Sequence, residues 1–324
     1  MEKGVYLAFS YDTEQPVPDR LPPDIISEAD YSLLPLNKKK RLWADYLRDG
    51  LWENPAFLQR SLKELETIQV LGELFTSFGG EFTSFVLGQW LEKIVEALGP
   101  KKVKDAFASG AIDVQSHSYE HKTFLSTGDI TRERISPLLP PEEISEQLRK
   151  SKMAISHHLG TTPIGLRTPM GNIAPFDNPE IIKLFKENGF QFVSSWLKKA
   201  QREANIPAEA QPFFYSQLEF PDILEIPGVG WFDVHHTQPT RMLVFDDEET
   251  IWTEEEFAAY YIGLIEDGLE AAENRPIFIP LVFHPWAVQY YDPSLKAHTE
   301  ILRFAQKHGV RVSSYNDINN LLRK

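Results

Sequence analysis

The chain has no cysteine among its 324 residues, and this absence excludes several kinds of chemistry. Without a thiol there is no disulfide, no cysteine nucleophile and no thiolate ligand for a metal ion. A metal site in this protein would have to use nitrogen and oxygen atoms from histidine, aspartate and glutamate. A chain of this length can bury a large core without cross-links, so a stable fold needs no disulfide.

Long apolar runs are also missing. The apolar run that follows Gly4 spans about six residues and comes after the acidic Glu2, whereas a secretory signal needs roughly seven to fifteen apolar residues. No segment approaches the roughly eighteen apolar residues of a membrane span. We therefore expect a cytoplasmic protein that does not insert into a membrane.

Positive charge is scarce, because 33 lysine and arginine residues face 47 aspartate and glutamate residues and leave a net charge of −14. The only dense basic patch is 38–40, which is typical of a solvated loop or helix start. This balance opposes binding to nucleic acid, which requires clustered basic residues. Hydrophobic residues make up 42% of the chain and charged residues 25%, as in soluble globular proteins.

Segments of strand and helix character alternate from one end of the chain to the other. The predicted strands are residues 5–11, 82–87, 111–114, 164–166, 190–194, 223–226, 231–234, 277–283 and 310–313. Such alternation predicts an α/β fold with parallel strands, and seven or eight units favour a TIM-like barrel over an open sheet. We predict one single-domain, distorted (β/α) barrel over residues 1–324, with a proline-rich loop or lid at about residues 15–40.

Side chains able to perform chemistry follow several of these predicted strands. His117 and His121 are four residues apart, so both imidazoles can reach one metal ion if the segment forms a helical turn or a strand end that curls. By itself this spacing is a weak signal, because paired surface histidines are common. An acidic pair, Asp12 and Glu14, ends the first strand, and His284 ends the apolar run at 277–283. The carboxyl ends of barrel strands form one mouth, so we expect these residues to converge.

Four motifs in this order resemble the polysaccharide deacetylase family, which has the NodB homology domain and is also called carbohydrate esterase family 4. The resemblance spans nearly the whole chain. The matching segments are Ser10-Tyr-Asp-Thr-Glu14, His117-Ser-Tyr-Glu-His121, Arg167-Thr-Pro-Met-Gly171 and Leu281-Val-Phe-His-Pro-Trp286. The first motif departs from the common form, in which two aspartates stand side by side. A spaced acidic pair is similar to that of an intracellular subgroup with peptidoglycan deacetylases of the Helicobacter type and allantoinase-like members.

The resemblance implies a role for each matching residue. Asp12 is expected to be the catalytic base, with Glu14, His117 and His121 as the metal ligands. In an alternative register Asp12 binds the metal, and Ser10 stands where the family usually has its base. His284 is expected to be the general acid, since an imidazole titrates near neutrality.

Other residues have supporting roles in this interpretation. Arg167 is expected to hold the base carboxylate by a bidentate pair. Tyr119, Pro169 and Trp286 are predicted to contact the substrate. Asp113 could orient a ligand histidine, and a strand-end acid without a function is almost equally plausible.

The resulting hypothesis is a metal-dependent hydrolase of carbon–nitrogen bonds other than peptide bonds. The expected reaction is N-deacetylation of an N-acetylated sugar or a related small amide, and the partner is a saccharide or other small molecule. One divalent ion is expected, with Zn²⁺ preferred by the ligand set and Co, Mn, Fe or Ni as alternatives. Hydrolysis of a cyclic amide, as in allantoinase-like relatives, and a non-catalytic carbohydrate- or metabolite-binding protein are the other readings. A homo-oligomer is left open.

Overall fold

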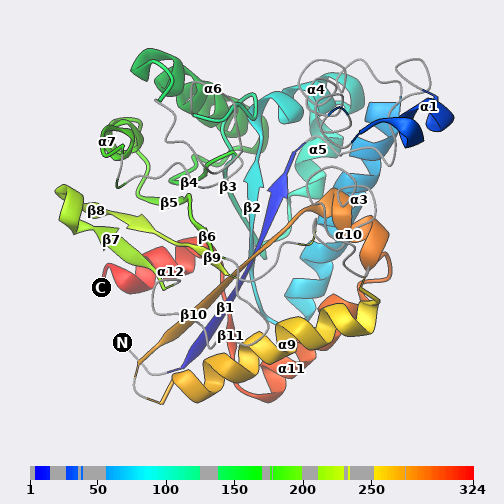
Figure 1. Cartoon of the computed structure of the whole chain (residues 1–324), viewed down its shortest axis with the longest axis vertical. Coiled ribbons are helices and arrows are strands. Elements are labelled where there is room, and N and C mark those ends of the chain that lie inside the picture. The colour runs from blue at the N-terminus through cyan, green and yellow to red at the C-terminus, as the bar shows by residue number, and fades with distance from the viewer. Residues whose placement is uncertain are drawn as a thin grey trace.

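A curved, mainly parallel β-sheet forms the centre of the molecule, and most of the helices lie around its outer side (Figure 1). The computed structural model describes residues 4–14, 27–35, 38, 56–124, 138–169, 176, 178–198, 211–229, 233, 252–273 and 275–324. The strands are β1 (Val5–Thr13), β2 (Phe82–Val86), β3 (Ile112–Ser116), β4 (Gly165–Arg167), β5 (Phe192–Ser194), β6 (Leu197–Lys198), β7 (Phe213–Tyr215), β8 (Phe220–Glu225), β9 (Gly228–Val229), β10 (Ile277–Phe283) and β11 (Arg311–Val312). The helices are α1 (Glu28–Leu33), α3 (Ala56–Ser77), α4 (Gly88–Leu98), α5 (Pro100–Ala106), α6 (Pro141–Leu159), α7 (Glu180–Glu187), α9 (Glu254–Ala271), α10 (Pro285–Tyr291), α11 (Lys296–Lys307) and α12 (Tyr315–Leu322).

The main sheet has the order β10-β1-β2-β3-β4-β5-β8-β7, with β11 paired to β1 as well. All of these pairs are parallel except β7 with β8. No backbone pair joins β7 to β10 in the described ranges, so the barrel is incomplete there. The side chain of Gln211 bridges this gap through hydrogen bonds to the backbone N–H and C=O of Phe278. The predicted α/β barrel-like fold is therefore confirmed, and the extent of the domain stays a prediction.

The two faces of β1 explain how the sheet positions a site. Val5, Leu7, Phe9 and Tyr11 point outward into the largest apolar cluster, against α3, α9 and α11. Every second residue between them points inward, because side chains alternate along a strand. The inward series ends in Asp12, followed by Glu14 just beyond the strand, so both acids face the interior at its carboxyl end.

Local sequence signals account for many of the element boundaries. The predicted capping box at the start of α9 is present, with Thr253 and Glu256 each bonded to the other's backbone. Helices α5, α10 and α12 and strand β7 were not predicted. The stretch at 15–40 was expected to have little regular structure, yet its described part contains α1. Most of the strand expected at 231–234 lies outside the described residues.

Helices that could cross a membrane are not found in the part of the chain that the structure describes.

Candidate metal centre and active site

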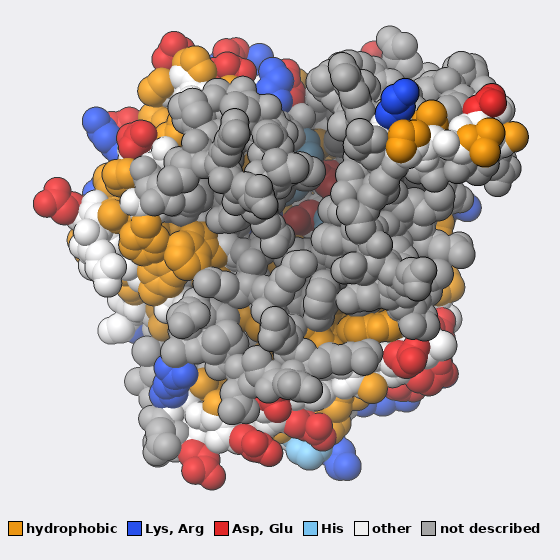
Figure 2. All heavy atoms as spheres, in the orientation of Figure 1, with side chains coloured by type: hydrophobic (Ala, Val, Ile, Leu, Met, Phe, Trp, Pro, Cys, Tyr) orange, Lys and Arg blue, Asp and Glu red, His pale blue; other side chains and the backbone are white. Residues whose placement is uncertain are grey.

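Six predicted site residues from different parts of the chain meet at the carboxyl end of the sheet. Acidic and histidine side chains come into view near the centre of the face shown in Figure 2. The residues are Asp12 and Glu14 at the end of β1, His117 and His121 after β3, Arg167 at the end of β4 and His284 after β10. Parallel strands deliver their carboxyl ends to one edge, which explains why residues so distant in sequence converge.

Glu14, His117 and His121 form a compact group of possible metal ligands. Oε2 of Glu14 lies 2.7 Å from Nε2 of His121 and 3.5 Å from Nε2 of His117. One donor atom from each of the three residues falls within 4.8 Å of the others. Two imidazoles and one carboxylate suit a divalent ion such as Zn²⁺ and leave coordination positions open for reactants. The residues present therefore fit a catalytic metal ion.

A hydrogen bond at Nδ1, on the side of the ring away from Glu14, fixes the ring of His117. Its Nδ1 donates to the backbone carbonyl of Arg167 over 3.0 Å, because a carbonyl can only accept. In a neutral imidazole this leaves the lone pair of Nε2 directed toward Glu14. A second hydrogen bond of this kind sets the orientation and tautomer of a metal-binding histidine.

The segment from His117 to His121 is an irregular loop rather than the helical turn that the spacing allowed. Ser118 and His121 both have positive φ angles, 66° and 56°. The first residues of α4 support the loop, because the N–H groups of Gly88 and Gln89 donate to the carbonyls of Ser118 and Tyr119. A Cβ at Gly88 would lie 2.7 Å from the ring of Tyr119, so glycine is required for this close approach.

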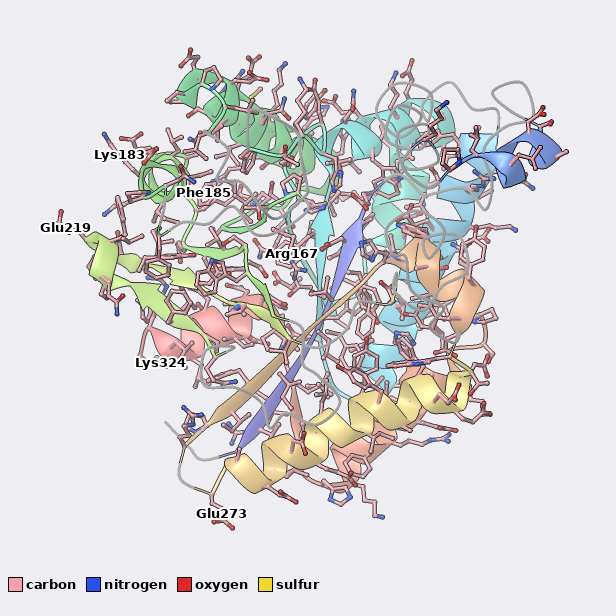
Figure 3. All side chains as sticks on the ribbon, in the orientation of Figure 1. Arg167, Lys183, Phe185, Glu219, Glu273 and Lys324 are labelled. Atoms are coloured by element: carbon pink, nitrogen blue, oxygen red, sulfur yellow. The ribbon has the colours of Figure 1, made fainter. Side chains whose placement is uncertain are left out.

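Arg167 lies inside the barrel among the strands (Figure 3), and only 1% of it is exposed. Its Nη1 is 3.6 Å from Oδ1 of Asp12, and its Nη2 donates to Ser10 and to the hydroxyl of Tyr315. The guanidinium also lies 4.6 Å from the centre of the Phe85 ring. Arg167 contacts Asp12 through Nη1 alone, so the expected bidentate pair is not formed.

His284 is paired with Asp233, a residue that was not predicted to belong to the site. Nδ1 of His284 donates to Oδ1 of Asp233 over 2.8 Å, and its backbone N–H donates to Oδ2 over 2.6 Å. Burial lowers the pKa of His284, but the charge and hydrogen bond of Asp233 outweigh it and raise the pKa to about 9. Nε2 of His284 lies 3.8 Å from Oε1 of Glu14, so this ring faces the ligand group.

Electrostatic attraction between Glu14 and His121 favours the charged forms of both side chains. Burial alone would raise the pKa of Glu14, but His121 and His117 hold it well below its ordinary range, so the carboxylate is ionised. Burial lowers the pKa of His121, and the charge of Glu14 outweighs this effect and raises it. A proton on His121 therefore competes with a metal ion for the same nitrogen.

The remaining predicted residues are placed around this group. The hydroxyl of Tyr119 donates a hydrogen bond to Glu92 over 2.5 Å. Pro169 is buried two residues after Arg167. Trp286 is also buried, and its ring centre lies 5.4 Å from that of His284. Asp113 contacts Thr83, Gln115 and the N–H of Asn316 instead of a ligand histidine, so its expected orienting role is wrong.

This chain is similar to known proteins in part of its sequence and in its fold. Residues 67–193 match the family model described as polysaccharide deacetylase. A polysaccharide deacetylase structure from Mycobacterium smegmatis is 17% identical, with 99% of this chain and 91% of that chain covered and a TM-score of 0.61. One from Pseudomonas aeruginosa PAO1 is 15% identical, with 98% and 90% covered and a TM-score of 0.58. The structure of PuuE allantoinase is 14% identical, with the same coverage and the same TM-score of 0.58.

No curated protein sequence matches the chain. At these identities the solved structures show a shared fold, and the family match adds the segment that carries His117, His121 and Arg167. Residues 67–193 match the polysaccharide deacetylase model, which confirms the resemblance indicated by the motifs. The narrower subgroup stays a prediction.

Proposed function

We propose that this protein is a metal-dependent hydrolase that removes the acetyl group from an N-acetylated sugar or a related small amide. The observation that carries the proposal is the convergence of two sets of groups. Glu14, His117 and His121 offer three ligand atoms within 4.8 Å, and Nε2 of His284 lies 3.8 Å from Oε1 of Glu14. A metal-dependent amide hydrolase needs such a ligand set beside a proton donor.

The geometry supports a separate role in the proposed hydrolysis for each site residue. Glu14, His117 and His121 would hold a divalent ion, which would supply the Lewis acidity needed to activate water and polarise the carbonyl. Asp12, beside the cationic Arg167, accepts the proton of the attacking water. His284, protonated through its pairing with Asp233, gives a proton to the departing nitrogen. Arg167 fixes Asp12, and Asp233 fixes the ring of His284.

Two substrate classes fit the proposed reaction. The family match favours an N-acetylated sugar, because the model that covers residues 67–193 is that of polysaccharide deacetylases. A cyclic amide is the second candidate, because an allantoinase structure shares the fold at a TM-score of 0.58. Both reactions break a C–N bond next to a carbonyl and use the same ligands, base and acid.

The test is hydrolysis by the purified protein over a panel of N-acetylated sugars, simple acetamides and cyclic amides. Release of acetate or ring opening is measured with added Zn²⁺, Co²⁺, Mn²⁺, Fe²⁺ or Ni²⁺. We expect turnover with at least one substrate class, abolished by chelator and by His117→Ala. Stoichiometric metal without turnover across the panel would instead favour a binding protein that has lost catalysis.

A further inference from the structure

The two histidines of the candidate metal centre are held in place in different ways. His117 is fixed through its ring, by the bond from Nδ1 to the carbonyl of Arg167. Within the described residues, Nδ1 of His121 has no hydrogen-bond partner, and its Nε2 faces Glu14. Apart from this contact with Glu14, the position of the His121 ring depends on the backbone that carries it.

That backbone has an unfavourable conformation. His121 has a φ of 56°, and Ser118, three residues earlier, has a φ of 66°. A left-handed conformation is strained for a residue with a Cβ, and it persists where the surrounding structure holds it. The loop therefore needs contacts that keep His121 in this geometry.

One side chain from α6 holds the residue just before His121. The backbone N–H of Glu120 donates to Oε1 of Gln147 over 2.9 Å, and Nε2 of Gln147 donates to Oε2 of Glu120 over 2.9 Å. Gln147 is only 4% exposed, so its amide is committed to this contact. One helical turn later, the hydroxyls of Ser151 and Ser116 lie 2.8 Å apart, so α6 holds the loop at both ends.

We propose that Gln147 is a positioning residue for the metal centre, gripping Glu120 at both its backbone and its side chain so that His121 meets the ion together with His117 and Glu14. The proposal rests on the metal site proposed above. Gln147 does for His121, through the main chain, what the Arg167 carbonyl does for His117 through the ring. Without this grip the loop relaxes from its left-handed conformation and moves the His121 nitrogen away from the other two ligands.

The test uses substitutions that remove, disturb and restore the two hydrogen bonds. Gln147→Leu keeps the volume and removes both bonds. Gln147→Glu keeps an acceptor for the Glu120 N–H but places two carboxylates together. The exchange Gln147→Glu with Glu120→Gln restores both bonds with the partners swapped. The Glu120→Gln part of this exchange also removes the partly exposed Lys122–Glu120 ion pair, which contributes little to stability. Met153→Leu, at an exposed position of the same helix, is the control.

The dissociation constants of Zn²⁺ and Co²⁺ are measured by competition with a chromophoric chelator, alongside the thermal unfolding of each metal-free variant. We expect Gln147→Leu and Gln147→Glu to weaken binding about 10- to 100-fold, as for other residues that orient a ligand. The exchange variant should recover most of this loss, and Met153→Leu should match the wild type. If Gln147→Leu does not fold, the comparison of Gln147→Glu with the exchange variant decides.

Two outcomes overturn the inference and separate it from the proposed function. Wild-type protein that binds one ion, with Gln147→Leu binding equally tightly, overturns the positioning role alone. Wild-type protein that binds no ion overturns the proposed metal site and the positioning role together.

Discussion

His284 and Asp233 form a two-point contact in which one carboxylate accepts both the Nδ1 hydrogen and the backbone N–H of the histidine. The contact locks the ring at the end of β10 and leaves its Nε2 directed toward Glu14, 3.8 Å away. The charge of Asp233, 2.8 Å from Nδ1, favours the protonated imidazole of His284. The pairing therefore prepares His284 to donate a proton at neutral pH.

Asp233→Asn should move the alkaline limb of the pH–activity profile to lower pH. His284 must be protonated to act as an acid, and its pKa is about 9 in the wild type, so activity should fall above that pH. Without the aspartate charge, burial lowers the pKa of His284 and only the charges of Asp12 and Glu14 still raise it, so the pKa should fall below its wild-type value. The profile of kcat against pH measures this shift.

The matched control is Asp292→Asn, which alters another buried aspartate that accepts Nδ1–H of a histidine, His298, outside the site. This variant should leave the alkaline limb where it is. An unchanged limb in Asp233→Asn would show that His284 is not the acid.

Arg167→Met should separate catalysis from metal binding. The side chain of Arg167 is the cation beside Asp12, whereas only its backbone carbonyl holds His117. The substitution should lower kcat roughly 100-fold or more, since a general base contributes about that much. Metal affinity, measured with a chelating dye, should change far less. A parallel loss of metal would mean that the side chain supports the ligands instead.

Metal affinity should rise with pH through and above the ordinary histidine pKa of 6.5, because the pKa of His121 is raised by Glu14. Its proton must leave before the nitrogen can bind an ion. Calorimetry in buffers of different ionisation enthalpy should show release of up to about one proton per ion near neutral pH. Binding without proton release would contradict the raised pKa.

Asp113 should make the folded state less stable as pH rises. Burial raises its pKa from 3.8 to about 6, more than its hydrogen bonds from Gln115 and Thr83 lower it. The folded state thus binds a proton that the unfolded state has released. This contribution is fully present below the unfolded pKa and is lost as pH rises through about 6.

The difference in unfolding free energy between wild type and Asp113→Asn should change by up to about 3 kcal/mol over that pH range. Urea unfolding at several pH values measures it. A difference that is constant with pH would contradict the raised pKa of Asp113.

The sequence predicted much of the site because its residues follow recognisable strands. His117, Arg167 and His284 each come directly after or at the end of a β-rich apolar segment, and parallel strands bring such positions together. The prediction for Asp113 failed because β3 extends to Ser116, two residues beyond its expected end. Asp113 is therefore near the start of the strand, away from the mouth.

Other features depend on tertiary contacts that spacing does not reveal. Asp233 lies 51 residues from His284, within the strand predicted at 231–234, and only the folded chain shows that they pair. The grip of Gln147 on Glu120 likewise joins a helix to a loop 27 residues away. The positive φ of His121 is likewise a feature that the His117–His121 spacing does not predict.

The most direct test of the proposed site is the metal content of two variants, Glu14→Gln and Asp12→Asn, compared with wild type. The geometry places Glu14 with the histidines and Asp12 with Arg167. Wild type and Asp12→Asn should each hold about one divalent ion per chain, and Glu14→Gln should lose it. Both variants should be inactive, Asp12→Asn with its ion still bound. Retention of the ion by Glu14→Gln and its loss from Asp12→Asn would contradict this assignment and place Asp12 on the metal.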